Sequence, residues 1–87
     1  MHAIIVKVTI NDVEAATQLL QQEVVPQVSA APGFVAGYWT RKDNSGISMV
    51  VFESEEAANA ASERVPGGMP ESVTLESVDV REVVANA

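Results

Sequence analysis

The aromatic and basic side chains near residue 40 are the strongest candidates for a binding site. Trp39 is the single tryptophan of the chain and follows the single tyrosine, Tyr38. Alternate residues of a strand point to opposite faces, so Trp39 and Arg41 would share one face and Tyr38 would lie on the other. One hypothesis is that Trp39 stacks on a flat aromatic ligand while Arg41 orients an anion. The alternative, which we favour, is that one ring fills the core and the other packs at a subunit interface.

Two further residues are of types that enzymes use for acid–base chemistry. His2 is the only histidine, and histidine is a common general base. Its place at the second residue favours a solvated strand end instead. Lys7 lies between apolar neighbours, where burial would make its amine a nucleophile or base. A pairing with Glu76 or Glu82 across the sheet is the interpretation we favour. The catalytic residues stay unknown, and the candidates for lining a ligand cavity are Trp39, Arg41, Tyr38, His2 and Lys7.

No pattern of a metal or cofactor site is present. The chain contains no cysteine and one histidine, which excludes disulfides and a histidine-rich metal site within one chain. Glu55 and Glu56 are adjacent and would point apart on a helix. Residues 66–70 (PGGMP) have no lysine and no phosphate-loop pattern. We interpret them as a connector, with a lid over the helix–sheet cleft as the alternative, and we expect no metal and no cofactor.

Length and charge limit the classes of function that remain. The 87 residues suffice for a single domain, residues 1–87, whose small core would gain from oligomerisation. Twelve acidic against five basic residues give a net charge of −7, which repels phosphate backbones and anionic lipids. We therefore expect neither a nucleic-acid nor a membrane partner. The first residues lack the pattern of a signal sequence, so the expected compartment is the cytoplasm.

Six segments carry the periodicity of strands or helices. Strand patterns cover residues 2–10, 34–41, 46–53 and 73–84. Helical spacing of apolar residues covers 13–28 and 54–65. The order βαββαβ predicts a ferredoxin-like α+β domain with a four-stranded antiparallel sheet and two helices on one face. In this motif the first and third strands are central, which fits their apolar residues on both faces.

Five residues are expected to shape these elements locally. Asn11 is expected to cap the first helix, with Glu14 completing a capping box. Pro26 falls inside that helix and predicts a kink or an early end. Ser54 is expected to cap the second helix. Gly37, inside the second strand, predicts a bulge or a close approach by another backbone.

The predicted sheet has more apolar surface than two helices can cover. The strands at 2–10 and 46–53 are apolar on both faces, and two helices shield only one. In the last strand, alternation places Val78 and Val80 on one face, and Val73 and Leu75 on the other. A large uncovered apolar face is unusual in a monomer, so the expected partner is a second copy of the chain, as a homodimer.

Three short motifs open the second strand, lie within it, and span the junction between the third strand and the second helix. They are Pro32-Gly33-Phe34, Gly37-Tyr38-Trp39 and Phe52-Glu53-Ser54-Glu55-Glu56-Ala57. With the order of elements, they make the chain similar to the dimeric α/β-barrel superfamily, and within it to the antibiotic biosynthesis monooxygenase-like domains. The resemblance implies that two sheets face each other across a two-fold axis and close a barrel.

The resemblance also implies a range of activities. The family includes enzymes that oxidise polycyclic phenols without metal or flavin. It also includes enzymes that open haem with an Asn, a Trp and a His, of which the His lies on the second helix. Residues 54–65 contain no histidine, so haem opening is not expected. The implied function is cofactor-independent oxidation or isomerisation of a small aromatic compound. The alternative is a non-catalytic dimeric protein that binds a small apolar or aromatic ligand, or acts as an accessory subunit.

Overall fold

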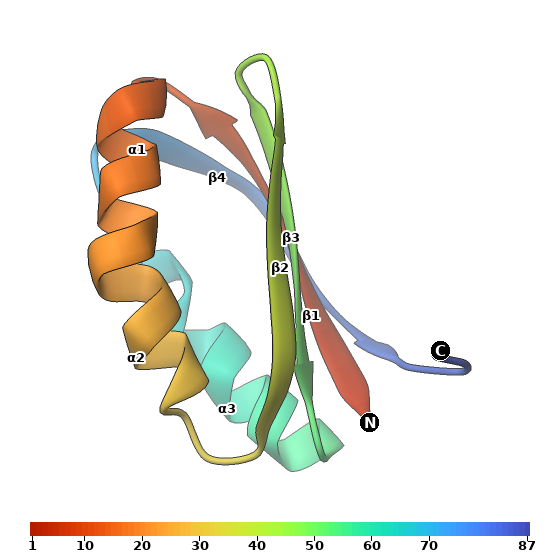
Figure 1. Ribbon diagram of the computed structural model, residues 1–87. Coiled ribbons are helices and arrows are strands. Elements are labelled where there is room, and N and C mark those ends of the chain that lie inside the picture. Colours follow the sequence, from red (N-terminus) through yellow and green to blue (C-terminus); the bar gives the residue numbers. More distant parts are fainter.

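The four segments rich in β-branched residues form the four strands of one sheet in the computed structural model (Figure 1). The structure describes residues 1–87, with the burial of each except residue 68. The strands are β1 (His2–Ile10), β2 (Phe34–Lys42), β3 (Ser45–Phe52) and β4 (Val73–Glu82). The helical elements are α1 (Val13–Leu19), the π turn η1 (Leu20–Val24), α2 (Val25–Ser29), α3 (Glu55–Arg64) and the 3-10 turn η2 (Pro66–Gly68). The last strand was predicted to reach residue 84, but Val84 is 87% exposed and lies beyond β4.

The strand order confirms the predicted sheet. The strands run β2-β3-β1-β4, and each neighbouring pair is antiparallel. The apolar strands β1 and β3 are therefore central, and β2 and β4 are the edges. The helices lie on one side of the sheet, to its left in Figure 1; we call the side that they cover the inner face, and the other the open face. The result is an α+β fold compatible with the ferredoxin-like arrangement.

The first helix is capped by a different residue from the one predicted. The Asp12 Oδ1 atom accepts a hydrogen bond from the Ala15 backbone N–H at 3.1 Å. Asn11 instead donates its side-chain N–H to the Thr74 hydroxyl at 3.0 Å. The prediction that Asn11 caps the helix is wrong because its amide is engaged with the start of β4.

Pro26 does not end the first helix. Before it, the backbone widens into the π turn η1, where the Val25 N–H bonds the Leu20 carbonyl five residues back. Pro26 then occupies the second position of α2. The π turn before it interrupts the regular i→i−4 bonding from which a proline inside a helix removes one N–H. The irregularity expected at Pro26 is thus a π turn, a known way for a helix to absorb a local mismatch.

A bulge in β4 reverses the predicted faces of two residues. Along β4, Val78 lies opposite Val6, but the next paired positions shift, so that Leu75 lies opposite Val8 and Val73 opposite Ile10. Because the extra residue restarts the alternation, Val73 and Leu75 share the inner face with Val78. Their predicted place on the other face is wrong. The bulge adds apolar residues to the inner face.

The core lies between the inner face and α3. Its buried residues are Ile4, Val6, Val50, Phe52 and Ala58. Phe52 is 1% exposed, and its ring meets that of Phe34 edge to face, with centroids 6.2 Å apart and planes at 82°. The Ser54 hydroxyl accepts a bond from the Ala57 N–H at 3.1 Å, which confirms the predicted cap of α3 and fixes that helix over the core.

Within the described part of the chain, none of the helices has both the length and the apolar character needed to traverse a bilayer.

Candidate functional site

A cavity of about 590 Å³ lies between the inner face and the helices. Its floor is the sheet and its roof is the first helix, with α3 and residues 69–70 at one side. No residue of α1, η1 or α2 is fully buried, although this helix carries an apolar stripe. Leu20, Val24 and Val28 are only half-buried, so the helix leaves space above the sheet that side chains do not fill. The walls are mostly apolar, which is typical of small-molecule sites.

Trp39 forms part of the floor of this cavity. It lies on the inner face, in register with Ser48 of β3, and also packs against the core residues. A methyl group added at Gly37 would come within 2.7 Å of the far edge of the Trp39 ring. Gly37 therefore gives room for the indole, and the close neighbour predicted there is this ring rather than another backbone. Trp39 contacts the core, as the favoured interpretation expects of one of the two rings, and it also lines the cavity.

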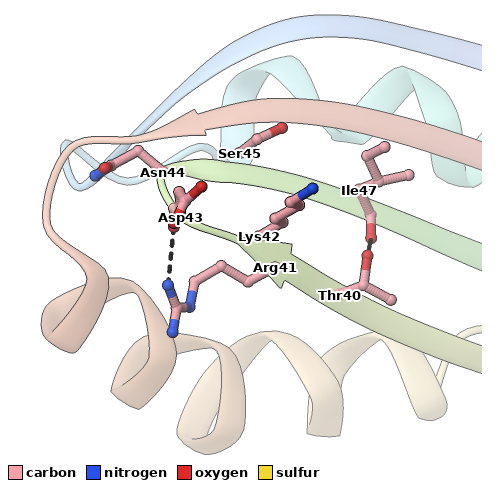
Figure 2. Close-up of a pocket in the computed structure, with 7 residues that line it drawn as sticks. All are labelled: Thr40, Arg41, Lys42, Asp43, Asn44, Ser45 and Ile47. Atoms are coloured by element: carbon pink, nitrogen blue, oxygen red, sulfur yellow. Dashed lines mark hydrogen bonds between the residues drawn. The ribbon is translucent and has the colours of Figure 1, made fainter.

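Arg41 lies two residues further along β2, on the same face and at the rim of the cavity. Its guanidinium donates one hydrogen bond to the Asp43 carbonyl oxygen at 2.9 Å, drawn in Figure 2. Its side chain turns back toward the β2–β3 hairpin on the side of the first helix (Figure 2). The pairing of Trp39 and Arg41 on one face is thus as alternation predicts.

A second, more open hollow lies at the β2–β3 hairpin and is lined by residues 40–45 and Ile47 (Figure 2). It shares Thr40, Arg41 and Ile47 with the larger cavity. Arg41 therefore stands where the two hollows adjoin.

A second arginine at the cavity wall was not predicted. Arg64, in the last turn of α3, lines the cavity together with Ala61 of the same helix. Among the described residues that line the cavity, Arg41 and Arg64 are the two that carry a charge. The alanines of α3 indicate that this helix can pack close to the sheet. The sequence does not give the distance between α3 and β2, so it did not place Arg64 at the cavity.

Two of the predicted cavity residues, Tyr38 and Lys7, lie on the open face instead. Tyr38 is 63% exposed there, opposite to Trp39. Lys7 is exposed and makes no ion pair with a described residue. The expected pairing fails for two reasons. The Glu76 carboxylate accepts a hydrogen bond from the Thr9 hydroxyl at 2.9 Å, and Glu82 lies across from His2 on the inner face.

His2 is half-buried at the end of β1, away from the cavity. Its side chain is 20% exposed, and its Nε2 atom lies 3.3 Å from the Glu55 carboxylate at the start of α3. The Nδ1 atom is buried and has no partner among the described residues. His2 is thus at the strand end as predicted, but it is less solvated than predicted because α3 begins beside it.

The structure brings together Trp39 and Arg41 of the five predicted site residues. In the described part of the chain, no three His, Cys, Asp or Glu side chains are grouped so that they can hold a metal ion. No protein-family model matches the sequence, and no curated protein matches it significantly. The arrangement offers an apolar chamber with arginines at its rim.

Proposed function

We propose that this protein binds a small apolar or aromatic molecule in the cavity between its sheet and its helices. The observation that carries the proposal is the cavity volume of about 590 Å³, which falls in the range of roughly 300–1,000 Å³ that small-molecule sites occupy. Burial of a ligand there also supplies apolar contacts for the half-buried residues of the first helix. The side chains of Trp39 and Ser48 give one flat and one hydrogen-bonding surface on the floor.

A binding assay with two matched pairs of substitutions tests this proposal. Ala16 and Ala61 line the cavity, whereas their neighbours Ala15 and Ala60 are exposed on the same helices. The variant Ala16→Phe/Ala61→Phe should weaken binding of the neutral fluorescent probe N-phenyl-naphthylamine by about tenfold or more, because the two rings occupy the space of the probe. The isomeric variant Ala15→Phe/Ala60→Phe should bind as the wild type does. Equal binding by both variants would show that the probe binds elsewhere.

We propose a second copy of the chain as the partner of the open face, in a barrel of the antibiotic biosynthesis monooxygenase-like type. On this face Tyr38 and Met49 are opposite each other in register, and Ile47 lies two residues along β3. Their exposed fractions are 63%, 41% and 45%, an apolar group of the kind that marks interaction surfaces. Toward β4 the same face carries Asp79 and Arg81, so the contact is centred on β2 and β3.

Sedimentation equilibrium tests the dimer. The expected mass is twice the 9.2 kDa of the chain. Met49→Lys should shift the mass toward the monomer, since it places a charge in the apolar contact. Gln22→Lys adds the same charge at an exposed position of the first helix and should leave the mass unchanged. A wild-type mass near 9 kDa at micromolar concentration would refute the dimer.

Cofactor-independent oxidation of a small aromatic compound is the second candidate function. It is favoured by the position of Trp39 and Arg41 on one wall, where a ring and an anionic oxygen of a phenolate would be held together. Binding without turnover is the better-supported function because the described residues that line the cavity include no His, Asp, Glu, Lys or Cys to move a proton. Oxygen uptake above blank with a panel of hydroquinones, lost in Trp39→Ala, would establish the enzyme.

A further inference from the structure

We infer that the ligand of this cavity is an amphipathic organic anion, with its carboxylate at Arg41 and its apolar or aromatic body over Trp39. The inference rests on the proposed binding function and adds the chemical class of the ligand. It follows from three observations: the sign of the charges at the rim, the unused donors of Arg41, and the distance along β2 between the two residues.

The charges around the cavity are opposite in sign to those of the chain. The sequence has 12 acidic and five basic residues, yet the part of the cavity wall that the structure describes contains two arginines and no carboxylate. Neither Arg41 nor Arg64 forms an ion pair with a described residue. Both are exposed, so they lie at the rim, while the walls below them are apolar. A molecule with an anionic head and an apolar body matches this division.

Arg41 has the donors needed to hold a carboxylate. A guanidinium has five N–H groups in a planar fork, and Arg41 uses one in its bond to the Asp43 carbonyl oxygen. That bond holds the side chain toward the hairpin and leaves other N–H groups for two oxygens of one carboxylate. Preorganisation of this kind reduces the entropy lost when a ligand is bound.

The spacing of Arg41 and Trp39 suits one ligand that contacts both. The backbone positions of the two residues lie about 6.6–6.8 Å apart along the strand. Because the indole reaches toward Gly37 and the guanidinium toward Asp43, a bicyclic ring or a longer apolar body is needed to contact both. The far edge of the Trp39 ring lies so close to Gly37 that there is no room for a methyl group there. Trp39 is half-buried and lines the cavity, so part of its indole is available to the ligand body.

Displacement of bound N-phenyl-naphthylamine by two ligands of the same shape tests the inference. Naphthoate carries the carboxylate, and methyl naphthoate is its neutral ester. The wild type should bind naphthoate about tenfold more tightly, near the lower end for a charge-assisted hydrogen bond because the rim is exposed. Arg41→Gln should remove most of this preference and leave the ester affinity within about twofold, because only the anion uses the guanidinium.

Two further variants separate local recognition from net charge. Arg64→Gln should weaken naphthoate binding by a smaller factor than Arg41→Gln does, since Arg64 contributes charge without the carboxylate contact. Arg81→Gln removes the same charge from the open face, where Arg81 lies 3.8 Å from Asp79, and should change neither affinity.

The possible failures are distinguishable. Equal affinities of the wild type for naphthoate and its ester would overturn the anionic ligand and leave the cavity function standing. Equal losses for both ligands in Arg41→Gln would also overturn it, because Arg41 would then act on the shape of the cavity. Failure of N-phenyl-naphthylamine to bind the wild type would refute the cavity function, and the inference with it.

Discussion

Replacing Gly33 by alanine adds one methyl group at the entry to β2, where the structure leaves no room for it. Gly33 has a φ of +81°, and an added Cβ would lie 2.9 Å from the Cβ of Ala57 on α3. The Ala57 Cβ is fixed to the helix backbone, so no side-chain rotation relieves the contact. Either α3 or the turn before β2 must move.

The loss of stability has two parts. Holding an L-residue in the left-handed region costs about 1–2 kcal/mol, and overpacking costs about 1–3 kcal/mol. Allowing for partial relaxation, Gly33→Ala should lower the free energy of unfolding by about 2–4 kcal/mol. The whole stability expected of a chain of this length is only about 4–13 kcal/mol. The substitution is therefore severe.

Urea unfolding followed by Trp39 fluorescence and circular dichroism measures this loss. Gly67→Ala is the matched control, since a Cβ there meets nothing within 4 Å, and it should change the stability by less than about 1 kcal/mol. Protein concentration must be fixed because association would add to the apparent stability. Adding Ala57→Gly to Gly33→Ala should recover the stability that is lost to overpacking. In a double-mutant cycle this recovery is measured as a coupling energy of about 1–2 kcal/mol.

The outcome that refutes this reasoning is a Gly33→Ala variant as stable as Gly67→Ala. A double-mutant cycle without coupling would refute the contact with Ala57 alone and leave the backbone conformation as the cause.

Three other substitutions give measurable outcomes. Phe52→Ala should lower the free energy of unfolding by about 3–5 kcal/mol in urea titrations, because Phe52 is 1% exposed; a loss below about 1 kcal/mol would contradict its place in the core. Asp12→Ala should lower the free energy of unfolding by about 1 kcal/mol through loss of the bond to the Ala15 N–H, seen as a lower melting temperature; an unchanged melting curve would contradict that cap. Gly37→Ala should displace the Trp39 ring toward the cavity, with a shifted emission maximum and a loss of about 1 kcal/mol; unchanged emission would refute the contact.

Much of the fold follows from local patterns. The bounds of β1 and the cap at Ser54 agree with the sequence because they depend on neighbouring residues: β-branched runs favour strands, and a hydroxyl before a helix satisfies a free N–H. The order of elements and the apolar character of β1 and β3 also gave the strand order β2-β3-β1-β4. The opposite faces of Tyr38 and Trp39 follow from simple alternation.

Prediction failed where contacts between distant segments compete with local ones. Asn11 is a good cap by type, but its amide bonds Thr74 across the fold, and Asp12 takes its place. The bulge in β4 moves Leu75 to the inner face, because one extra residue exchanges the faces of all residues on the far side of the bulge. Lys7 lies opposite Ser77 on β4 and Ile47 on β3, so the register of the strands places no carboxylate directly across from it.

The sequence by itself determined which residues are apolar, where the strands and helices form, and that the two helices cover one face of the sheet. The tertiary structure alone decided that the first helix stands off that sheet, leaving the cavity, and that Arg41 and Arg64 both line it. The physical reason is that periodicity specifies the direction of a side chain within its own element. The distance between two elements depends on how their side chains pack against each other, which no single segment contains.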